Sequence, residues 1–99
     1  MISYELSARA RLDLQLLWNY IAEDSVDAAE RFTNDVDQAF ELLARQPGLG
    51  HTRADLPNAR YRVWPVHPYL IIYFADAKPL KIHRIVHGAR DLKSLFRKK

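Results

Sequence analysis

Six consecutive apolar residues, Tyr69 to Phe74, constrain the fold of this chain more than any other stretch. Such a run predicts a strand that is covered on both faces, and strands of this kind are usually central in their sheet. Two further strands are predicted, one before this run at residues 60–66 and one after it at residues 80–87, and both carry basic side chains. Pro68 and Pro79 mark the turns between the strands, because proline disfavours continuation of a strand. The second half of the chain is therefore expected to form a sheet with an apolar centre and cationic flanks.

The first half predicts a short strand followed by a helical hairpin. Residues 2–6 alternate between apolar and polar, as in a half-buried strand. Ser7 can cap a first helix over Ala8–Glu23, and either Asp24 or Ser25 can cap a second helix over Val26–Arg45. The second helix has the cleanest apolar periodicity in the chain, with Ala29, Phe32, Val36, Ala39, Phe40 and Leu43 at intervals of three and four.

The first helix carries two apolar stripes. One stripe contains Ala10, Leu14, Leu17, Trp18 and Ile21 and is expected to face the sheet, which predicts a core position for Trp18. The other stripe, Leu12, Leu16 and Tyr20, lies near the opposite side of the helix. This second stripe must contact either the neighbouring helix or another molecule.

A loop at residues 47–59 and a C-terminal helical turn complete the predicted chain. Thirteen residues make a long loop for a small domain, which suggests a functional or partner-contacting segment. Asp91 can cap the final turn, Leu92 to Arg97, in which Leu95 and Phe96 are the apolar anchors. The order β-α-α-β-β-β with a short C-terminal helix predicts a two-layer α+β fold, expected to be a single domain over residues 1–99.

Charge is divided unevenly between the two halves of the chain. Residues 1–50 hold four Lys/Arg against nine Asp/Glu, a formal charge of −5, whereas residues 51–99 hold eleven against three, a charge of +8. A cationic half of this kind favours an anionic partner, either nucleic acid or an acidic protein segment, over a merely solvated surface. The chain has no cysteine, no recognisable signal peptide and no apolar run long enough to span a bilayer, so we expect a cytoplasmic protein without membrane contact.

The order and spacing of several short motifs resemble the RelE/ParE superfamily of toxins from type II toxin–antitoxin and plasmid stabilisation modules. The resemblance covers nearly the whole chain. It includes Asp13-Leu14-x-x-x-Trp18-x-Tyr20-Ile21 in the first helix and Leu43-x-x-x-Pro47-x-x-Gly50-x-x-Arg53 after the second. The order of the elements ends in Arg84-Ile-Val-His-Gly-Ala-Arg-Asp91. The most specific part of the resemblance is the strand pair Arg62 and Tyr69-x-Ile71-x-Tyr73, followed by His87-Gly-x-Arg-Asp91. It implies a mainly antiparallel four-stranded sheet with the first strand beside the last and a helical hairpin on one face.

The superfamily contains two functional branches, and the residues favour one of them. RelE-like members are ribosome-dependent mRNA endoribonucleases, and ParE-like members are non-enzymatic inhibitors of DNA gyrase. RNA cleavage needs a base, an acid and cations. The candidate nuclease residues here are Arg60, Arg62, Arg84, His87 and Arg90. RelE-like nucleases resemble one another in having a tyrosine, or a His-Tyr pair, near the C-terminus. No tyrosine follows Gly88 in this chain. We therefore favour the ParE-like branch over the nuclease or a degenerate member that binds only its antitoxin.

The ParE-like resemblance also implies partners. It implies a cognate ParD-like antitoxin with a ribbon-helix-helix domain and an acidic C-terminal segment, and contact with operator DNA only through the antitoxin complex. The candidate antitoxin-binding residues are Leu12, Leu16, Tyr20, Arg60, Arg62 and Arg84. The candidate target-binding residues are Trp64, Arg90, Lys93, Phe96, Arg97, Lys98 and Lys99.

Histidine spacing does not predict a metal site. His83 and His87 are four residues apart on a strand, where they would share a face about 13 Å from each other. That distance is too long for one metal ion to bridge. Without cysteine or a histidine pair on a helix, we expect neither a metal nor a cofactor.

Overall fold

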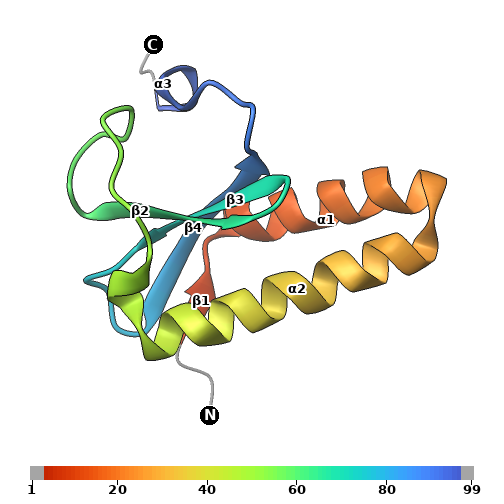
Figure 1. The fold of residues 1–99 in the computed structure, drawn as a ribbon, viewed down its shortest axis with the longest axis horizontal. Coiled ribbons are helices and arrows are strands. Elements are labelled where there is room, and N and C mark those ends of the chain that lie inside the picture. Colours follow the sequence, from red (N-terminus) through yellow and green to blue (C-terminus); the bar gives the residue numbers. More distant parts are fainter. Residues whose placement is uncertain (1–3, 97–99) are drawn as a thin grey trace.

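The structure is a computed structural model that describes residues 4–96. A helical hairpin lies on one face of a single sheet, as Figure 1 shows, so the predicted α+β fold is confirmed. The elements, in order, are β1 (Tyr4–Leu6), α1 (Ala8–Asp24), α2 (Val26–Arg45), the 3-10 helix η1 (Pro47–Leu49), β2 (Tyr61–Val66), β3 (Tyr69–Phe74), β4 (Leu80–His87) and α3 (Leu92–Leu95).

The sheet has the strand order β1-β4-β3-β2, so the first strand lies beside the last, as the superfamily resemblance implies. The pairs β2–β3 and β3–β4 are antiparallel, whereas β1 runs parallel to β4, which makes the sheet mixed. The apolar strand β3 has a neighbour on each side, and Ile71, Ile72 and Tyr73 are fully buried. The strand β3 is thus covered on both faces, as its continuous run of apolar residues predicts.

Serine side chains start both long helices. The Ser7 hydroxyl accepts a hydrogen bond from the N–H of Ala10 at 2.9 Å, and the Ser25 hydroxyl accepts one from Ala28 at 3.0 Å. Ser25 rather than Asp24 is therefore the cap of α2. Each cap satisfies one of the backbone donors that the first turn of a helix leaves free.

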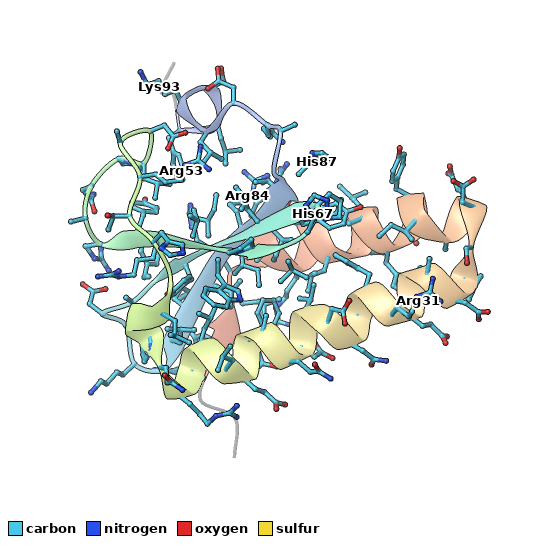
Figure 2. All side chains as sticks on the ribbon, viewed as in Figure 1. Arg31, Arg53, His67, Arg84, His87 and Lys93 are labelled. Carbon is cyan, nitrogen blue, oxygen red and sulfur yellow. The ribbon has the colours of Figure 1, made fainter. Side chains whose placement is uncertain are left out.

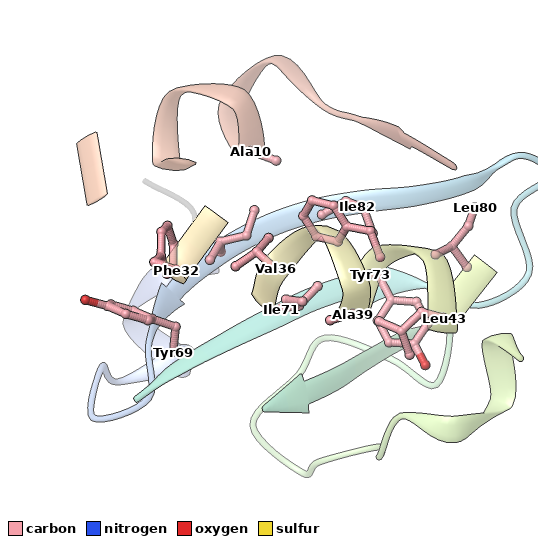
Figure 3. Close-up of a cluster of buried hydrophobic side chains, with 12 residues drawn as sticks. Ala10, Phe32, Val36, Ala39, Leu43, Tyr69, Ile71, Tyr73, Leu80 and Ile82 are labelled. Carbon is pink, nitrogen blue, oxygen red and sulfur yellow. The ribbon is translucent and has the colours of Figure 1, made fainter. Parts of the chain in front are cut away.

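The main core lies between the helical hairpin and one face of the sheet (Figure 3). All six periodic apolar residues of α2 are buried, as their spacing predicts. The twelve buried residues of this core are Ala10, Phe32, Val36, Ala39, Phe40, Leu43, Tyr69, Ile71, Tyr73, Leu80, Ile82 and Ile85. The side chains Leu14, Leu17 and Ile21 of α1 pack against it from a half-buried position.

A second, smaller cluster covers the other face of the sheet. Leu56, Val63, Ile72, Val86 and Leu92 are its buried members. Two of them come from outside the sheet, one from the loop after η1 and one from α3. Irregular segments and one short helix thus replace the long helices on this face.

Helix α1 differs from its prediction at two positions. Trp18 is only half-buried and is not part of either core cluster, so the prediction of a core position is wrong. Asp13, by contrast, is buried with 6% of its surface exposed. The core-facing side of α1 therefore includes a carboxylate, and Trp18 lies toward the side that faces α2.

Backbone groups of the edge strand β2, and of the part of β4 that extends beyond β1, are capped by other groups. On β2, Val63 exchanges two backbone hydrogen bonds of 2.8 Å with His51, and Pro65 has no N–H to offer on the same outward side. On β4, beyond the end of β1, the Ser7 hydroxyl donates to the carbonyl of His83 and the Asp13 carboxylate accepts from the N–H of Ile85. Capped edges of this kind disfavour the addition of a strand from another chain.

Within residues 4–96, no helix has the length and apolar character that crossing a membrane requires.

Candidate functional site

The second apolar stripe of α1 is exposed to solvent. Leu12, Leu16 and Tyr20 have 42%, 52% and 71% of their surface accessible, so α2 does not cover them. On a helix these residues follow one another at four-residue spacing, and they therefore form one continuous surface on a flank of α1. Three large apolar side chains in a row are a candidate contact surface for a protein partner.

A groove separates α1 from α2 on the outer side of the hairpin. Its volume is about 200 Å³, and Leu14, Trp18, Phe32 and Val36 form most of its apolar lining. Asp37 lies at its rim, and burial, followed by the charge of Glu41, raises the pKa of that carboxyl group. Because Trp18 lines this groove, a ligand in the groove would contact it.

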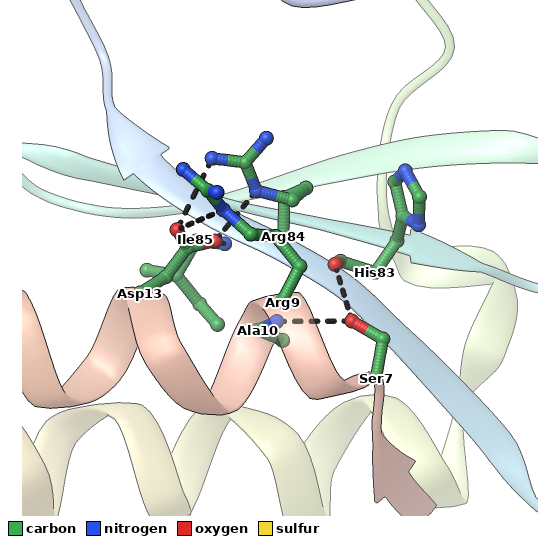
Figure 4. A network of polar contacts seen from close by, with 7 residues as sticks. All are labelled: Ser7, Arg9, Ala10, Asp13, His83, Arg84 and Ile85. Atoms are coloured by element: carbon green, nitrogen blue, oxygen red, sulfur yellow. Dashed lines mark hydrogen bonds and ion pairs between the residues drawn. The ribbon is translucent and has the colours of Figure 1, made fainter.

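Arg84 is bound to α1 by a buried ion pair. Its guanidinium donates to the two carboxylate oxygens of Asp13 at 2.7 and 3.1 Å, as Figure 4 shows. The same carboxylate accepts the N–H of Ile85 at 3.0 Å, and Arg9 lies 3.5 Å away. Because the arginine side chain is only 11% exposed and its donors are directed at Asp13, Arg84 joins α1 to the sheet.

A register shift in β4 changes which of its residues share a face of the sheet. Ile72 pairs with Arg84 and Tyr73 pairs with Ile82, so His83 is an extra residue in the ladder. A bulge of this kind redirects the neighbouring side chains. The prediction that His83 and His87 share a face is therefore wrong.

The two histidines instead contact different faces. The His83 ring stacks on Phe96 at 5.8 Å and also contacts Tyr61 and Phe74 on the face that carries the small cluster. Burial, followed by the charge of Arg84, lowers the pKa of His83. The exposed His87 contacts Tyr69, which belongs to the main core.

Arg60 and Arg62 lie together at the start of β2. Both line a surface hollow of about 360 Å³, together with Asp76. Arg60 donates to Asp76 at 3.0 Å and lies over the ring of Phe74, and its hydrogen bond lowers the pKa of Asp76. Arg62 donates to the carbonyl of Gly50 at 2.9 Å. These two residues are the candidate cations that the structure brings together.

The remaining candidates are distributed over the surface. Figure 2 shows that Arg53 and Lys93 lie on the side of the molecule with α3, whereas Arg31 projects from α2. Arg90 and Lys93 are exposed, and Phe96 is half-buried in the small cluster. Trp64 is half-buried against the main core and stacks with His51. Arg97, Lys98 and Lys99 lie outside the described residues.

The role of Asp13 was not predicted from the sequence. A signal was present, because Asp13 lies three residues after Ala10 and four before Leu17, on the stripe that faces the sheet. A carboxylate in that position needs a cationic partner, since burial of an unpaired charge is costly. An arginine on one of the strands was therefore to be expected opposite it.

The sequence also matches a known family over residues 4–92, described as the ParE toxin of the type II toxin–antitoxin system parDE. The chain belongs to the ParE toxin family. Toxin ParE1 of Caulobacter vibrioides is 26% identical over 95 residues, a length that covers 95% of this chain and 97% of the relative. Toxin ParE3 of the same organism is 28% identical over 88 residues, which cover 88% of this chain and 87% of the relative.

A solved structure shares the ParE-family fold. It is described as the chromosomal ParDE toxin–antitoxin system from P. aeruginosa, and it superposes with a TM-score of 0.69 at 19% identity. The match covers 88% of this chain and 96% of the other one. The position of the helical hairpin on the sheet is thus shared with a protein from a toxin–antitoxin system.

Within residues 4–96 of this ParE-family chain, no three His, Asp or Glu side chains lie close enough together to hold a metal ion.

Proposed function

We propose that this ParE-family toxin inhibits DNA gyrase by binding it, and that a cognate antitoxin neutralises it. The observation that carries the proposal is the dispersion of the five candidate nuclease residues. A catalytic base and the cations around a scissile phosphate must lie within hydrogen-bonding reach of one substrate.

The strand register gives the scale of this dispersion. Arg62 pairs with Tyr73, and His87 pairs with Tyr69, four residues away along β3. At the rise of a strand this separation is about 13 Å. Arg84 is in addition bound to Asp13. Such an arrangement supports recognition of a macromolecule by several separate surfaces rather than cleavage at one centre.

Induction of the protein in cells tests the mechanism. We expect a change in plasmid supercoiling and a DNA-damage response, and inhibition of supercoiling by purified gyrase in the presence of the purified toxin. The protein would instead be an endoribonuclease if it cleaved messages at the ribosomal A-site, lost this cleavage in the His87→Ala variant, and had no effect on gyrase.

The antitoxin is proposed to cover the exposed stripe of α1. An apolar stripe on α1 and cations on the sheet suit an extended acidic segment with apolar anchors. Arg60 and Arg62 are the sheet arginines that can contact its carboxylates, while Arg84 holds α1 in position through Asp13.

A charge introduced into the stripe tests this site. We expect Leu16→Glu and Tyr20→Glu to weaken the antitoxin complex, because each places a charge in an apolar contact. Val26→Glu is the matched control, since Val26 is 53% exposed, close to the 52% of Leu16, but lies outside the stripe. Equal affinity of the Leu16 and Val26 variants in calorimetric titration with the antitoxin would place the antitoxin elsewhere.

The gyrase contact is proposed to use the exposed cations near the C-terminus. Arg90 precedes α3, Lys93 lies within it, and Arg97, Lys98 and Lys99 follow it in the sequence. Deletion of the whole segment from Leu92 would remove a buried residue, so the sharper test removes only the last three residues. We expect this truncation, combined with Arg90→Ala and Lys93→Ala, to reduce gyrase inhibition while antitoxin binding stays intact.

A further inference from the structure

A groove runs between α2 and the edge strand β2, away from the exposed stripe of α1. It consists of two adjoining hollows of about 520 and 280 Å³, which share Asp35 and Val66. The floor of the larger hollow is apolar and includes Ala39, Leu42 and Trp64. Because α1 packs over β4 and α2 reaches β2, the groove and the α1 stripe lie on opposite flanks of the hairpin.

The α2 rim of this groove presents alternating blocks of charge. Arg31 lies toward one end, Asp35 and Glu41 lie in the middle, and Arg45 lies at the other end, all of them exposed. Arg31 and Asp35, like Glu41 and Arg45, are at the four-residue spacing that allows ion pairs on a helix. In the part of the chain that the structure describes, none of the four side chains forms an ion pair. They therefore remain available to a partner.

The opposite rim cannot accept a strand. The outward N–H and C=O groups of Val63 are bonded to His51, and Pro65 has no N–H. A ligand in this groove must therefore satisfy its own backbone hydrogen bonds, as an α-helix does.

We propose that this groove binds one amphipathic α-helix of a partner protein, with acidic residues at both ends and basic residues in the middle. Arg31 and Arg45 are 14 residues apart on α2, which corresponds to about 21 Å of helix. A partner helix of about 14 residues would pair its acidic ends with these arginines and its basic centre with Asp35 and Glu41. Its apolar side chains would cover Leu42 and Trp64. This inference does not depend on gyrase being the target.

A synthetic peptide tests the pattern with the full-length protein. The probe is a labelled 16-residue helical peptide with acidic ends, two central lysines and one apolar face. The control peptide has the same composition with basic ends and an acidic centre. In fluorescence anisotropy we expect the first peptide to bind about tenfold more tightly than the second.

The second part of the experiment reverses charges on the protein and repeats the binding measurement with both peptides. Arg31→Glu combined with Arg45→Glu is expected to invert the preference between the two peptides. Arg11→Glu, an exposed cation on α1 that does not line the groove, is the matched control and should change nothing. Circular dichroism verifies that each variant keeps its helices.

Several outcomes would overturn the proposal. They are equal binding of the two peptides, no binding of either, an unchanged preference in the doubly reversed variant, or equally tight binding of a proline-containing peptide that cannot be helical. Self-association in sedimentation that disappears in the doubly reversed variant would show that a second copy of this chain occupies the groove.

Discussion

The two faces of the sheet are covered in different ways, although the same strands contribute to both. On the helical face, α1 and α2 contribute half of a twelve-residue core, and regular apolar periodicity places their side chains. On the other face, a five-residue cluster is closed by a loop residue and by α3, a helix of four residues. Helices this short have little stability of their own.

This difference separates stability from adaptability. The helical face buries residues from elements that are long and continuous, and it should set the free energy of unfolding of the protein. The face with the small cluster is closed by segments that can detach without exposing the main core, and the low-stability parts of proteins are where local opening occurs. We therefore expect substitutions on the helical face to lower the free energy of unfolding more than substitutions on the other face, and to affect the whole fold rather than a local segment.

The largest expected effect comes from a cavity on the helical face. Phe40→Ala should lower the free energy of unfolding by about 3–5 kcal/mol, because Phe40 is buried in the main core. Leu92→Ala, equally buried but on the other face, should cost about 2 kcal/mol, the lower end for such a change. Urea denaturation measures both. Equal costs would show that the small cluster is as cooperative as the main core.

The ion pair between α1 and β4 should rank second. Asp13→Ala is expected to cost about 3 kcal/mol, because it leaves the Arg84 guanidinium and the Ile85 N–H without their partner. Asp76→Ala is the control, since the Arg60–Asp76 pair is exposed and should contribute little. If the two alanine variants unfold at the same urea concentration, the pair does not hold the helix on the sheet.

The turn that connects α2 to the sheet contains Gly48 and Gly50, and we expect substitution by alanine to destabilise the protein at Gly50 but not at Gly48. A Cβ at Gly50 would lie 2.7 Å from Cε1 of Tyr73, whose hydroxyl bonds both Gly50 and Pro47, so Gly50→Ala should cost about 1–3 kcal/mol. Gly48 has open space around it, so Gly48→Ala should be close to neutral. Thermal melts compare the two variants, and a destabilised Gly48 variant would contradict this reading of the turn.

The smallest effect is a pH dependence on the face with the small cluster. Burial lowers the pKa of His83 below its ordinary value of 6.5, so the unfolded chain binds a proton more readily than the folded one. Stability should therefore be constant above about pH 6.5 and decrease as the pH falls from there toward the folded pKa.

His83→Gln should flatten this part of the profile, and His67→Gln, at an exposed turn, should leave it unchanged. Amide protection factors in α3, which correct the exchange rates for their intrinsic pH dependence, should fall with pH in the original protein, and constant protection factors would argue against a role for His83 in holding that segment.

Much of the helical face could be predicted from the sequence. The bounds of α2 and its six buried residues follow from periodicity, because one face of an isolated helix already defines what it must bury. Trp18 and Trp64 were harder to place. Trp18 lies on an apolar stripe, yet it is half-buried and lines the groove between the helices. Trp64 packs on the main core from an edge strand. The spacing of residues on a helix does not reveal how far apart two helices lie.

The candidate site was predicted unevenly for a related reason. The exposed stripe of Leu12, Leu16 and Tyr20 was visible as a surplus apolar face on α1. By contrast, the ion pair between Asp13 and Arg84 joins residues 71 positions apart, and no local pattern announces it. Likewise, a bulge in β4 moves His83 and His87 to different faces.

The sequence by itself determined the order of the elements, the central position of β3 and the apolar faces of both helices, since these depend on patterns within one segment. Only the tertiary structure decided which charges are bound to one another, where the grooves lie and which groove each tryptophan lines. Those features depend on distances between segments, which are set when the helices and strands pack together.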